Sequence, residues 1–376
     1  MILKNIILEN FRNYVQETVE LNPKINLFIG ENAQGKTNLI EAIYYLATGR
    51  SFRNSRELEI INWNKDYLRL QIKFFKKSVN REFFIDFYYD KKGNKQLKIN
   101  GVKQKKLSNL WGLLQVVKFS PDDLNIIKAG PQERRKYFDL EICQLSPDYY
   151  HLNSQFYKIL QQRNILLKEI RDKDKKDDLL EIWDEQLVKK GSMIIKKRID
   201  FLKKLVPVAK NTHKEITSQK ELLDITYNSV LIDNPETDIE DIEKKYLLKL
   251  KEERKQEIIK GVTLTGPHRD DVLFYLNGKN LKIFGSQGQQ RTAILALKIA
   301  QLKLFSYLNE EHPLLLLDDV MSELDDYRRQ YLINLIQNNE IQTFITGTNL
   351  DFMKGNFDKR GIYLVENGNI KNLGRI

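Results

Sequence analysis

The chain has 376 residues, of which 41% are hydrophobic and 10% aromatic, so a sizeable core is available and a wholly disordered chain is excluded. Basic residues exceed acidic ones by 62 − 51 = 11, which indicates an acidic partner such as nucleic acid or anionic lipid, unless the lysines only solvate the surface. The single cysteine, Cys143, excludes an intrachain disulfide and a cysteine-based zinc cluster, and the four scattered histidines argue against a histidine-based metal site. With no apolar run of about 18 residues and with Glu9 inside the apolar start, the sequence predicts a soluble, cytoplasmic protein.

The first third of the chain is predicted to contain one strand–loop–helix unit followed by antiparallel sheet. Short β-rich runs at 2–9 and 15–21 precede a compact apolar run at 25–29, and 38–46 has helical spacing. Further strand-like runs are 67–75, 81–90 and 95–99, with a turn at 92–94 and a hairpin signal at 100–101.

The middle of the chain changes to helical patterns. Residues 148–205 have almost no Gly or Pro and carry two amphipathic helices around a charged hinge at 171–178. Residues 151–210 contain 15 Lys and Arg against 9 Asp and Glu. This charge is either a solvated outer face or a DNA-facing surface. A strand near 224–231, a charged helix near 239–259 and β-rich sequence from Val262 follow.

The last third is predicted to complete the first domain. Strands at 273–277 and 281–283 flank a hairpin at Asn277 and Gly278, and a long helix covers 287–308. Four consecutive leucines at 314–317 are typical of a fully buried parallel strand, and strands at 341–346 and 362–365 continue that sheet.

A phosphate-binding motif follows the strand at 25–29. It reads Gly30-Glu31-Asn32-Ala33-Gln34-Gly35-Lys36-Thr37 and fits G-x-x-x-x-G-K-[ST] without deviation. Glycines let successive N–H groups face a phosphate, and the following helix adds its positive end. Lys36 would reach the β- and γ-phosphates and the Thr37 hydroxyl would ligate Mg²⁺. The sequence therefore predicts an ATP and Mg²⁺ site.

The leucine strand ends in Asp318 and Asp319, which fits a Walker B strand. An acidic residue at the carboxyl end of a central parallel strand lies at the ligand edge of the sheet. We assign Asp318 to Mg²⁺ and Asp319 to the attacking water. The alternative is a buried strand that merely ends in two turn-forming aspartates.

A second helix start carries Ser286-Gln287-Gly288-Gln289. A Ser and a Gly at a helix N-terminus form another possible anion site. The alternative is that Ser286 is only an N-cap.

The order of these motifs, with Ser322 and Asp325 after the Walker B strand, resembles the ATP-binding-cassette ATPases, with signature, Walker B and D-loop in register. In that family the signature of one subunit completes the γ-phosphate site of the other, which implies a homodimer on ATP binding. Arg12 and Asn13 before the P-loop resemble SMC-type heads and are included in the predicted ATP site. Only 286 − 36 = 250 positions separate Lys36 from Ser286, too few for the long coiled coils of SMC proteins.

Over nearly its whole length the chain is similar to the RecF family of bacterial recombination mediator ATPases. The resembling segments are 11–13, 30–37, 119–124, 130–131 with 134–135, 162–164, 266–271, 286–291 and 317–325. The resemblance implies an α/β fold: an ABC-type P-loop ATPase head, with mixed parallel and antiparallel sheets around the P-loop helix, and an inserted, mainly helical lobe. We place the ATPase domain at 1–130 and 262–376 and the helical lobe at 131–261.

Some family positions stay open. The Q-loop residue is Gln115 or belongs to the turn 120–123, and the switch residue, a His in transporters, is Thr346 or Thr348. Asp319 replaces the family's catalytic glutamate and is one methylene shorter, which predicts slow turnover. His268 and Arg269 either brace the helical lobe or contact nucleotide or DNA.

The resemblance implies an ATP-dependent protein that binds gapped or junction DNA, hydrolyses ATP slowly with stimulation by DNA, and acts with RecO and RecR to load the RecA recombinase. The candidate DNA contacts, taken to be exposed, are Lys196, Lys197, Arg198, Lys203 and Lys204. One alternative is the ATPase subunit of an ABC transporter, which would need a membrane partner. The other is an ATP-driven DNA-processing enzyme, although the sequence has no appended acidic cluster for a nuclease and no second ATPase lobe for a helicase.

Overall fold

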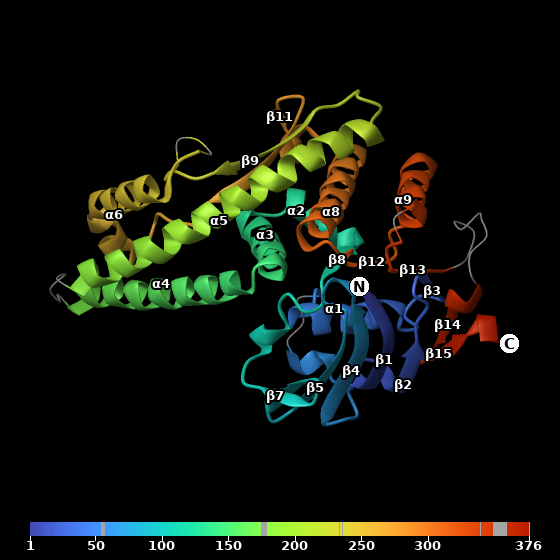
Figure 1. Cartoon of the computed structure of the whole chain (residues 1–376). Helices are drawn as coiled ribbons and strands as arrows, with labels where there is room; N and C mark the ends of the chain where they lie inside the picture. The colour runs from blue at the N-terminus through green and yellow to red at the C-terminus, as the bar shows by residue number, and fades with distance from the viewer. Residues whose placement is uncertain are drawn as a thin grey trace. The chain divides into compact units, whose positions relative to one another are not determined.

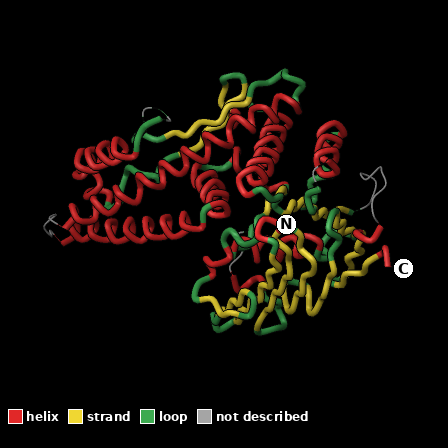
Figure 2. Tube along the Cα trace, viewed as in Figure 1, coloured by secondary structure: helices red, strands yellow, loops and turns green. Residues whose placement is uncertain are grey.

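The computed structural model describes residues 1–53, 57–173, 179–232, 234, 236–338, 340–348 and 359–375. Its internal contacts divide the chain into two compact units (Figures 1 and 2). Residues 1–123 and 298–376 form what we call the sheet unit, and residues 124–297 form the helical unit. The functional lobe boundaries expected at 131–261 remain a prediction.

An antiparallel sheet forms one layer of the sheet unit, in the order β2-β1-β4-β5-β6-β7. Its strands are β1 (Ile2–Phe11), β2 (Tyr14–Glu20), β4 (Tyr67–Lys76), β5 (Arg81–Asp90), β6 (Lys95–Ile99) and β7 (Val102–Gln104). Side chains alternate between its faces: in β4, Leu68, Leu70 and Ile72 are buried while Arg69 is exposed. The predicted antiparallel insertion is confirmed.

A second sheet holds the nucleotide motifs, in the order β15-β14-β3-β13-β12-β8. Its strands are β3 (Ile25–Ile29), β8 (Val116–Phe119), β12 (Leu314–Leu317), β13 (Thr343–Gly347), β14 (Ile362–Glu366) and β15 (Asn369–Asn372). All pairs are parallel except β14 with β15. Because β12 lies between β13 and β8, its leucines are fully buried, which explains the uninterrupted apolar run. Residues 314–372 therefore complete the sheet that β3 begins, as predicted, whereas the strand predicted at 273–277 lies in a separate sheet of the helical unit.

Helix α1 (Lys36–Thr48) lies between the two sheets. It contacts β1 and β4 of the first sheet and β8 and β13 of the second. Leu39, Ile40, Ile43 and Leu46 are all fully buried, so the helix forms the centre of this unit's core. The unit also contains α9 (Asp326–Asn338) and the short helices η1 (Glu57–Ile60), η2 (Lys77–Val79), η3 (Leu107–Leu110), η5 (Lys359–Gly361) and η6 (Leu373–Arg375).

Long helices dominate the helical unit (Figure 2). They are α3 (Pro131–Leu145), α4 (Pro147–Lys173), α5 (Leu179–Ile216), α6 (Ile239–Lys260) and the first part of α8 (Gln287–Asn309), with the short α2 (Asn125–Lys128) and α7 (Leu281–Phe284). A sheet in the order β11-β10-β9 contains β9 (Leu223–Asn228), β10 (Asp271–Leu276) and β11 (Lys279–Asn280). η4 (Pro121–Leu124) lies at the boundary. Both predicted helices are present as α4 and α5, and hinge positions 174–178 lie outside the described residues.

Two local predictions differ from the structure. Residues 281–283, expected as a strand, form α7, because the Asn280 side chain accepts a hydrogen bond from Lys282 N and caps the turn. The β-rich sequence from Val262 forms no strand before Asp271. Helices α3 and α9 and strand β8 were not predicted, because the helices are polar on most faces and the strand is four residues long. Among the described helices, none is long and apolar enough to cross a bilayer.

Candidate nucleotide-binding site

The phosphate-binding loop is supported by hydrogen bonds from the two residues Asn13 and Tyr14, where the chain passes from β1 to β2. Asn13 Nδ2 donates to the Gln34 carbonyl at 2.8 Å, and the Tyr14 hydroxyl donates to the Gly35 carbonyl at 2.9 Å. Gly35 has φ 121°, and a Cβ there would lie 2.7 Å from Asn13 Nδ2. Only glycine fits this position. The described contacts of Asn13 support the loop, and a direct contact of Asn13 with ATP remains a prediction.

The first turn of α1 is open to an anion. No side chain caps its N-terminus and no acidic residue lies in its first turn. Unpaired N–H groups at a helix start, together with the helix dipole, attract phosphate. The turn between β14 and β15 holds the preceding loop in place, because Asn367 N donates to Gln34 Oε1 at 2.6 Å and Gly368 N donates to the Gln34 carbonyl at 3.1 Å.

Lys36 lies in the same loop and is buried. Its ammonium donates to the carbonyls of Gly30 and Glu31, both at 2.6 Å. Burial lowers the pKa of Lys36, and the negative charges of Asp319 and Asp318 oppose that change. The structure therefore brings the predicted phosphate-binding cation close to both predicted acidic residues.

Asp318 is the centre of the site. Its Oδ1 accepts hydrogen bonds from the Thr37 hydroxyl at 2.8 Å and from the Thr346 hydroxyl at 2.9 Å. Burial raises the pKa of Asp318, and the two hydroxyl hydrogen bonds act in the opposite direction. The two residues predicted to hold the metal thus meet across 281 positions of sequence.

This donor set suits Mg²⁺. The hydroxyl of Thr37 and the carboxylate of Asp318 are hard oxygen ligands, and Mg²⁺ is usually held by one or two such groups plus phosphate oxygens and water. Across the part of the chain that the structure describes, no group of three or more His, Cys, Asp or Glu side chains is placed to hold a metal by itself.

Asp319 follows in a left-handed backbone conformation with φ 57°. Its N–H donates to the Thr346 hydroxyl at 2.9 Å, and its carbonyl accepts from the Ser322 hydroxyl at 2.8 Å. Thr346 therefore links the two acidic residues. Of the two candidate switch residues, Thr346 makes these contacts and Thr348 is exposed.

The two Q-loop candidates lie at opposite ends of strand β8. β8 runs parallel to β12, with Phe119 beside Leu317, so the turn 120–123 follows the strand on the same edge as Asp318. Gln115 precedes the strand, and its carbonyl accepts from Leu314 N at 2.9 Å. The geometry favours the turn 120–123.

One residue near this edge was missed by the sequence analysis. Lys118 is buried in β8, with its ammonium 4.5 Å from the Phe52 ring centroid and 3.7 Å from Asp123. The ammonium of Lys298 lies 3.3 Å from the same carboxylate. Burial lowers the pKa of Lys118. A lysine inside the apolar run Val-Val-Lys-Phe was the available signal.

Arg12 contacts α1. Its Nε and Nη2 donate to the two carboxylate oxygens of Glu41 at 3.0 and 2.6 Å, and Glu41 is fully buried. Its Nη1 donates to the Glu59 carbonyl at 2.8 Å. These contacts give Arg12 a structural role, and a contact with ATP remains a prediction.

The predicted signature is a capped helix start. Ser286 N donates to Gln289 Oε1 at 2.9 Å and Gln289 N donates to Ser286 Oγ at 3.3 Å, a reciprocal capping box. The N-cap alternative is therefore true of Ser286, but it does not account for Gly288. Among the described residues, a Cβ at Gly288 would meet nothing nearer than Ser286 Oγ at 4.0 Å.

The D-loop residues have local contacts. Asp325 Oδ1 accepts from Arg328 N at 2.9 Å and so caps α9, while Ser322 contacts Asp319 as described above. Roles for Gln287, Ser322 and Asp325 in a dimer remain predictions.

Among the candidate DNA contacts, the expected exposure of Arg198 is wrong. Arg198 is 2% exposed, and its Nε and Nη2 donate to the carboxylate of Asp139 at 2.8 and 2.9 Å. It lies on the inner face of α5, where the charge is paired. Lys196, Lys197, Lys203 and Lys204 remain partly or fully exposed, with Lys196 paired to Asp200 and Lys203 to Glu236.

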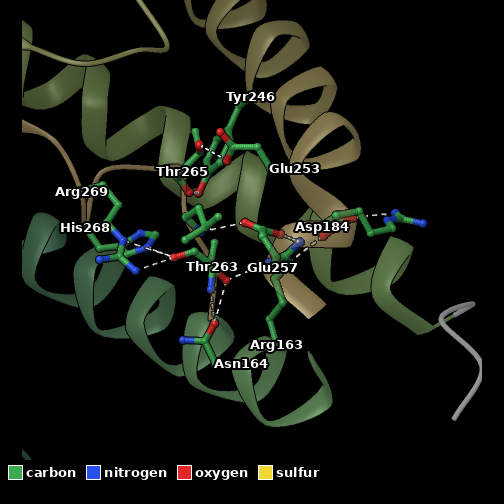
Figure 3. A network of polar contacts seen from close by, with 12 residues as sticks. Arg163, Asn164, Asp184, Tyr246, Glu253, Glu257, Thr263, Thr265, His268 and Arg269 are labelled. Carbon is green, nitrogen blue, oxygen red and sulfur yellow. Dashed lines mark hydrogen bonds and ion pairs between the residues drawn. The ribbon is translucent and has the colours of Figure 1, made fainter. Parts of the chain in front are cut away.

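Two motifs of the helical unit meet in one polar network (Figure 3). The carbonyl of Thr263 accepts from Arg269 Nη2 at 2.9 Å and lies 3.2 Å from His268 Nε2, while Thr263 N donates to Asn164 Oδ1 at 2.8 Å. Burial lowers the pKa of His268 to about 4. These contacts favour the bracing interpretation of His268 and Arg269.

Arg163 is the core of that network (Figure 3). It is fully buried and donates to Asp184 Oδ1 at 2.7 Å, to Glu257 Oε2 at 2.7 Å and to Thr263 Oγ1 at 2.8 Å. Helices α4, α5 and α6 are thereby joined through one guanidinium.

Comparisons with known proteins agree with this geometry. Residues 2–371 match the RecF/RecN/SMC N terminal domain family. The DNA replication and repair protein RecF of Clostridium kluyveri is 43% identical over 374 residues, covering 99% of this chain and all of that protein. RecF of Alkaliphilus oremlandii is 44% identical over 373 residues, covering 98% of this chain and all of that protein.

Solved structures give the same result. A structure of the recombination mediator protein RecF with ATP, described as part of the RecFOR pathway, has a TM-score of 0.92 and 38% identity, covering 99% of this chain and 97% of that one. An Smc head domain from Pyrococcus furiosus, at 18% identity and a TM-score of 0.58, shares the fold. The predicted ABC-type ATPase head is therefore confirmed.

Proposed function

Because the chain belongs to the RecF family, we propose that it is an ATP-dependent DNA-binding protein of recombinational repair. It binds gapped or junction DNA as an ATP-induced dimer and acts in the cytoplasm with RecO and RecR to promote RecA loading. The relative whose ATP-bound structure is known acts in the RecFOR pathway, which supports the choice of partners. A transporter ATPase is set aside, since the relatives named above are repair proteins.

The observation that carries the proposal is the contact of Thr37 and Thr346 with one carboxylate oxygen of Asp318. Backbone N–H groups of the loop and of the first turn of α1 bind the phosphates, and Lys36 supplies a positive charge. Thr37 and Asp318 would hold Mg²⁺. When bound, Mg²⁺ neutralises phosphate charge that develops during hydrolysis.

Asp319 is proposed to orient the attacking water. Its backbone is fixed through Thr346 and Ser322, so its position depends on the same threonine that contacts Asp318. An aspartate reaches less far than a glutamate, and we therefore propose a weak ATPase. Its stimulation by DNA is proposed from the family resemblance alone. Slow hydrolysis then sets the time for which the dimer stays closed on DNA.

The second half of each site is proposed to come from Ser286 and Gly288 of another copy. Packing among the described residues does not require glycine at Gly288, and an open backbone at a helix start permits close approach of a phosphate. Ser286→Arg places a bulky cation there and leaves the P-loop of the same copy untouched.

Sedimentation with ATP tests this arrangement. Ser286→Arg should bind ATP as a monomer, whereas the wild type and the control Gln256→Arg, on an exposed position of α6, should dimerise. A Ser286→Arg dimer as stable as that of the wild type would exclude the shared site. Incubation with gapped DNA and ATP tests the remaining alternative, an ATP-driven DNA-processing enzyme. Such an enzyme would cleave or unwind the DNA, whereas a clamp would retain it intact.

A further inference from the structure

Strand β9 leaves one edge of its sheet open. In the described part of the helical unit, the sheet order is β11-β10-β9, so β9 pairs with β10 on one side and with no strand on the other. A cavity of about 560 Å³ is lined by each of the residues 224–229. Because successive side chains of a strand point to opposite faces, a cavity lined by every residue in turn runs along the backbone edge.

The opposite wall of this cavity is one face of α5, beside which β9 runs in Figure 1. The lining residues recur at helical spacing and are mostly apolar: Ile199, Leu202, Lys203, Val206, Pro207 and Lys210. Pro207 lies inside the helix and has no N–H, so the carbonyl of Lys203, four residues earlier, loses its intrahelical donor. The groove therefore combines an apolar wall with backbone groups suited to an extended peptide.

The rim of the groove carries cations whose present partners are solvated. Lys203 pairs with Glu236, whose side chain is 83% exposed, and Lys210 pairs with Asp224, which is 48% exposed. Exposed ion pairs of this kind contribute little and exchange easily. A carboxylate arriving in the groove can compete for either lysine.

We propose that this groove binds an extended, acidic peptide segment of a partner protein as an added strand beside β9. Main-chain hydrogen bonds to a sheet edge require an extended backbone, and apolar side chains at alternate positions would face α5. The two rim lysines select carboxylates on the segment. The proposal rests on the proposed function only for its choice of candidate partners, RecO and RecR.

An array of overlapping short peptides covering RecO and RecR of the same organism tests the proposal with the full-length chain. The best binder is then measured by fluorescence anisotropy against wild type, Lys203→Glu, Val206→Glu and the control Lys189→Glu, which lies on α5 outside the groove. We expect binding by an acidic peptide, about tenfold weaker binding to each groove variant, and no change for the control. Amide hydrogen exchange in Leu223–Asn228 should slow when the peptide binds.

The opposite results would overturn the proposal. They are no peptide bound, equal binding to wild type and both groove variants, or unchanged exchange in β9. Protection of β9 in concentrated protein alone would identify a second copy as the occupant and likewise exclude the peptide. DNA binding with ATP, measured on the same preparations, keeps the outcomes separate: if it persists, failure of the groove experiment leaves the proposed function standing.

Discussion

In the sheet unit the charged motif residues gather where parallel strands end, whereas in the helical unit Arg163 and Arg198 lie inside the packing of helices. Asp318 and Lys36 are held by hydroxyls and loop carbonyls, beside a helix start that no side chain caps. Arg163 and Arg198 instead have carboxylates on more than one nitrogen and are 0% and 2% exposed.

The difference distinguishes charged motif residues that can bind a ligand from charged motif residues that only support the packing. A buried charge that is fully paired has no capacity left for a ligand, and removing its partner is costly. A charge at a strand end, held by neutral groups, can exchange those contacts for a phosphate or a metal. The comparison predicts that variants at Asp318 or Asp319 lose activity, whereas variants at the buried, paired arginines of the helical unit lose stability.

The largest effect is expected for Asp319→Asn. Loss of one positioned catalytic group typically lowers the rate by about 10²–10⁴, while the described hydrogen bonds of Asp319 come from its backbone and survive the change. The ATPase should fall by that factor with an unchanged melting temperature, and the protein should stay longer on gapped DNA when diluted into competitor DNA with ATP. Asp326→Asn, on a 99% exposed side chain, is the control. Release as fast as that of the wild type, with the ATPase abolished, would exclude hydrolysis as the release step.

Arg163→Met should mainly affect stability. It leaves Glu257 buried without its cation, although Asp184 keeps its ion pair with Arg254, and such a change costs about 3–5 kcal/mol in the free energy of unfolding. Urea unfolding measures this, with Arg171→Met as control, because Arg171 lies on the same helix in an exposed pair with Asp172. Equal stability of the two variants would contradict the structural role of the network.

The exposed lysines of α5 test whether this unit contacts DNA. Replacing Lys196, Lys197 and Lys204 together by Ala should flatten the dependence of log affinity on log salt by roughly one unit per lost phosphate contact. A matched set on α6, Lys251→Ala, Lys255→Ala and Lys260→Ala, is the comparison. An unchanged slope and affinity would identify the α5 lysines as a solvated face.

A smaller, pH-dependent effect is expected at His268. Its folded pKa of about 4 lies below the ordinary value of 6.5, so its contribution to stability is complete above pH 6.5 and is lost as the pH falls toward 4. Between pH 7 and pH 5 the wild type should lose about 2 kcal/mol relative to His268→Gln, which keeps a donor for the Thr263 carbonyl.

Burial raises the pKa of Asp270 to about 6, so Asp270 changes stability in the opposite direction over the same pH range. The comparison with His268→Gln removes this contribution. Asp270 is present in both proteins, so its contribution cancels. Parallel pH profiles for the two proteins would contradict the burial of a neutral imidazole at His268.

The sequence by itself determined the features that depend on neighbouring residues. The phosphate-binding loop, the leucine strand with Asp318 and Asp319, and the two long amphipathic helices were all predicted, because each is specified within a short window by spacing, glycine or apolar period. The order of the motifs was enough to indicate the family.

Only the tertiary structure decided which residues meet and which are buried. It placed the hydroxyls of Thr37 and Thr346 against one carboxylate oxygen of Asp318, because the carboxyl ends of β3, β13 and β12 lie next to one another in the sheet. It also buried Arg198, which the local pattern of Lys196-Lys197-Arg198 could not distinguish from its exposed neighbours, since Asp139 lies 59 positions away. Contacts between distant segments depend on strand order and helix packing, which no local pattern encodes.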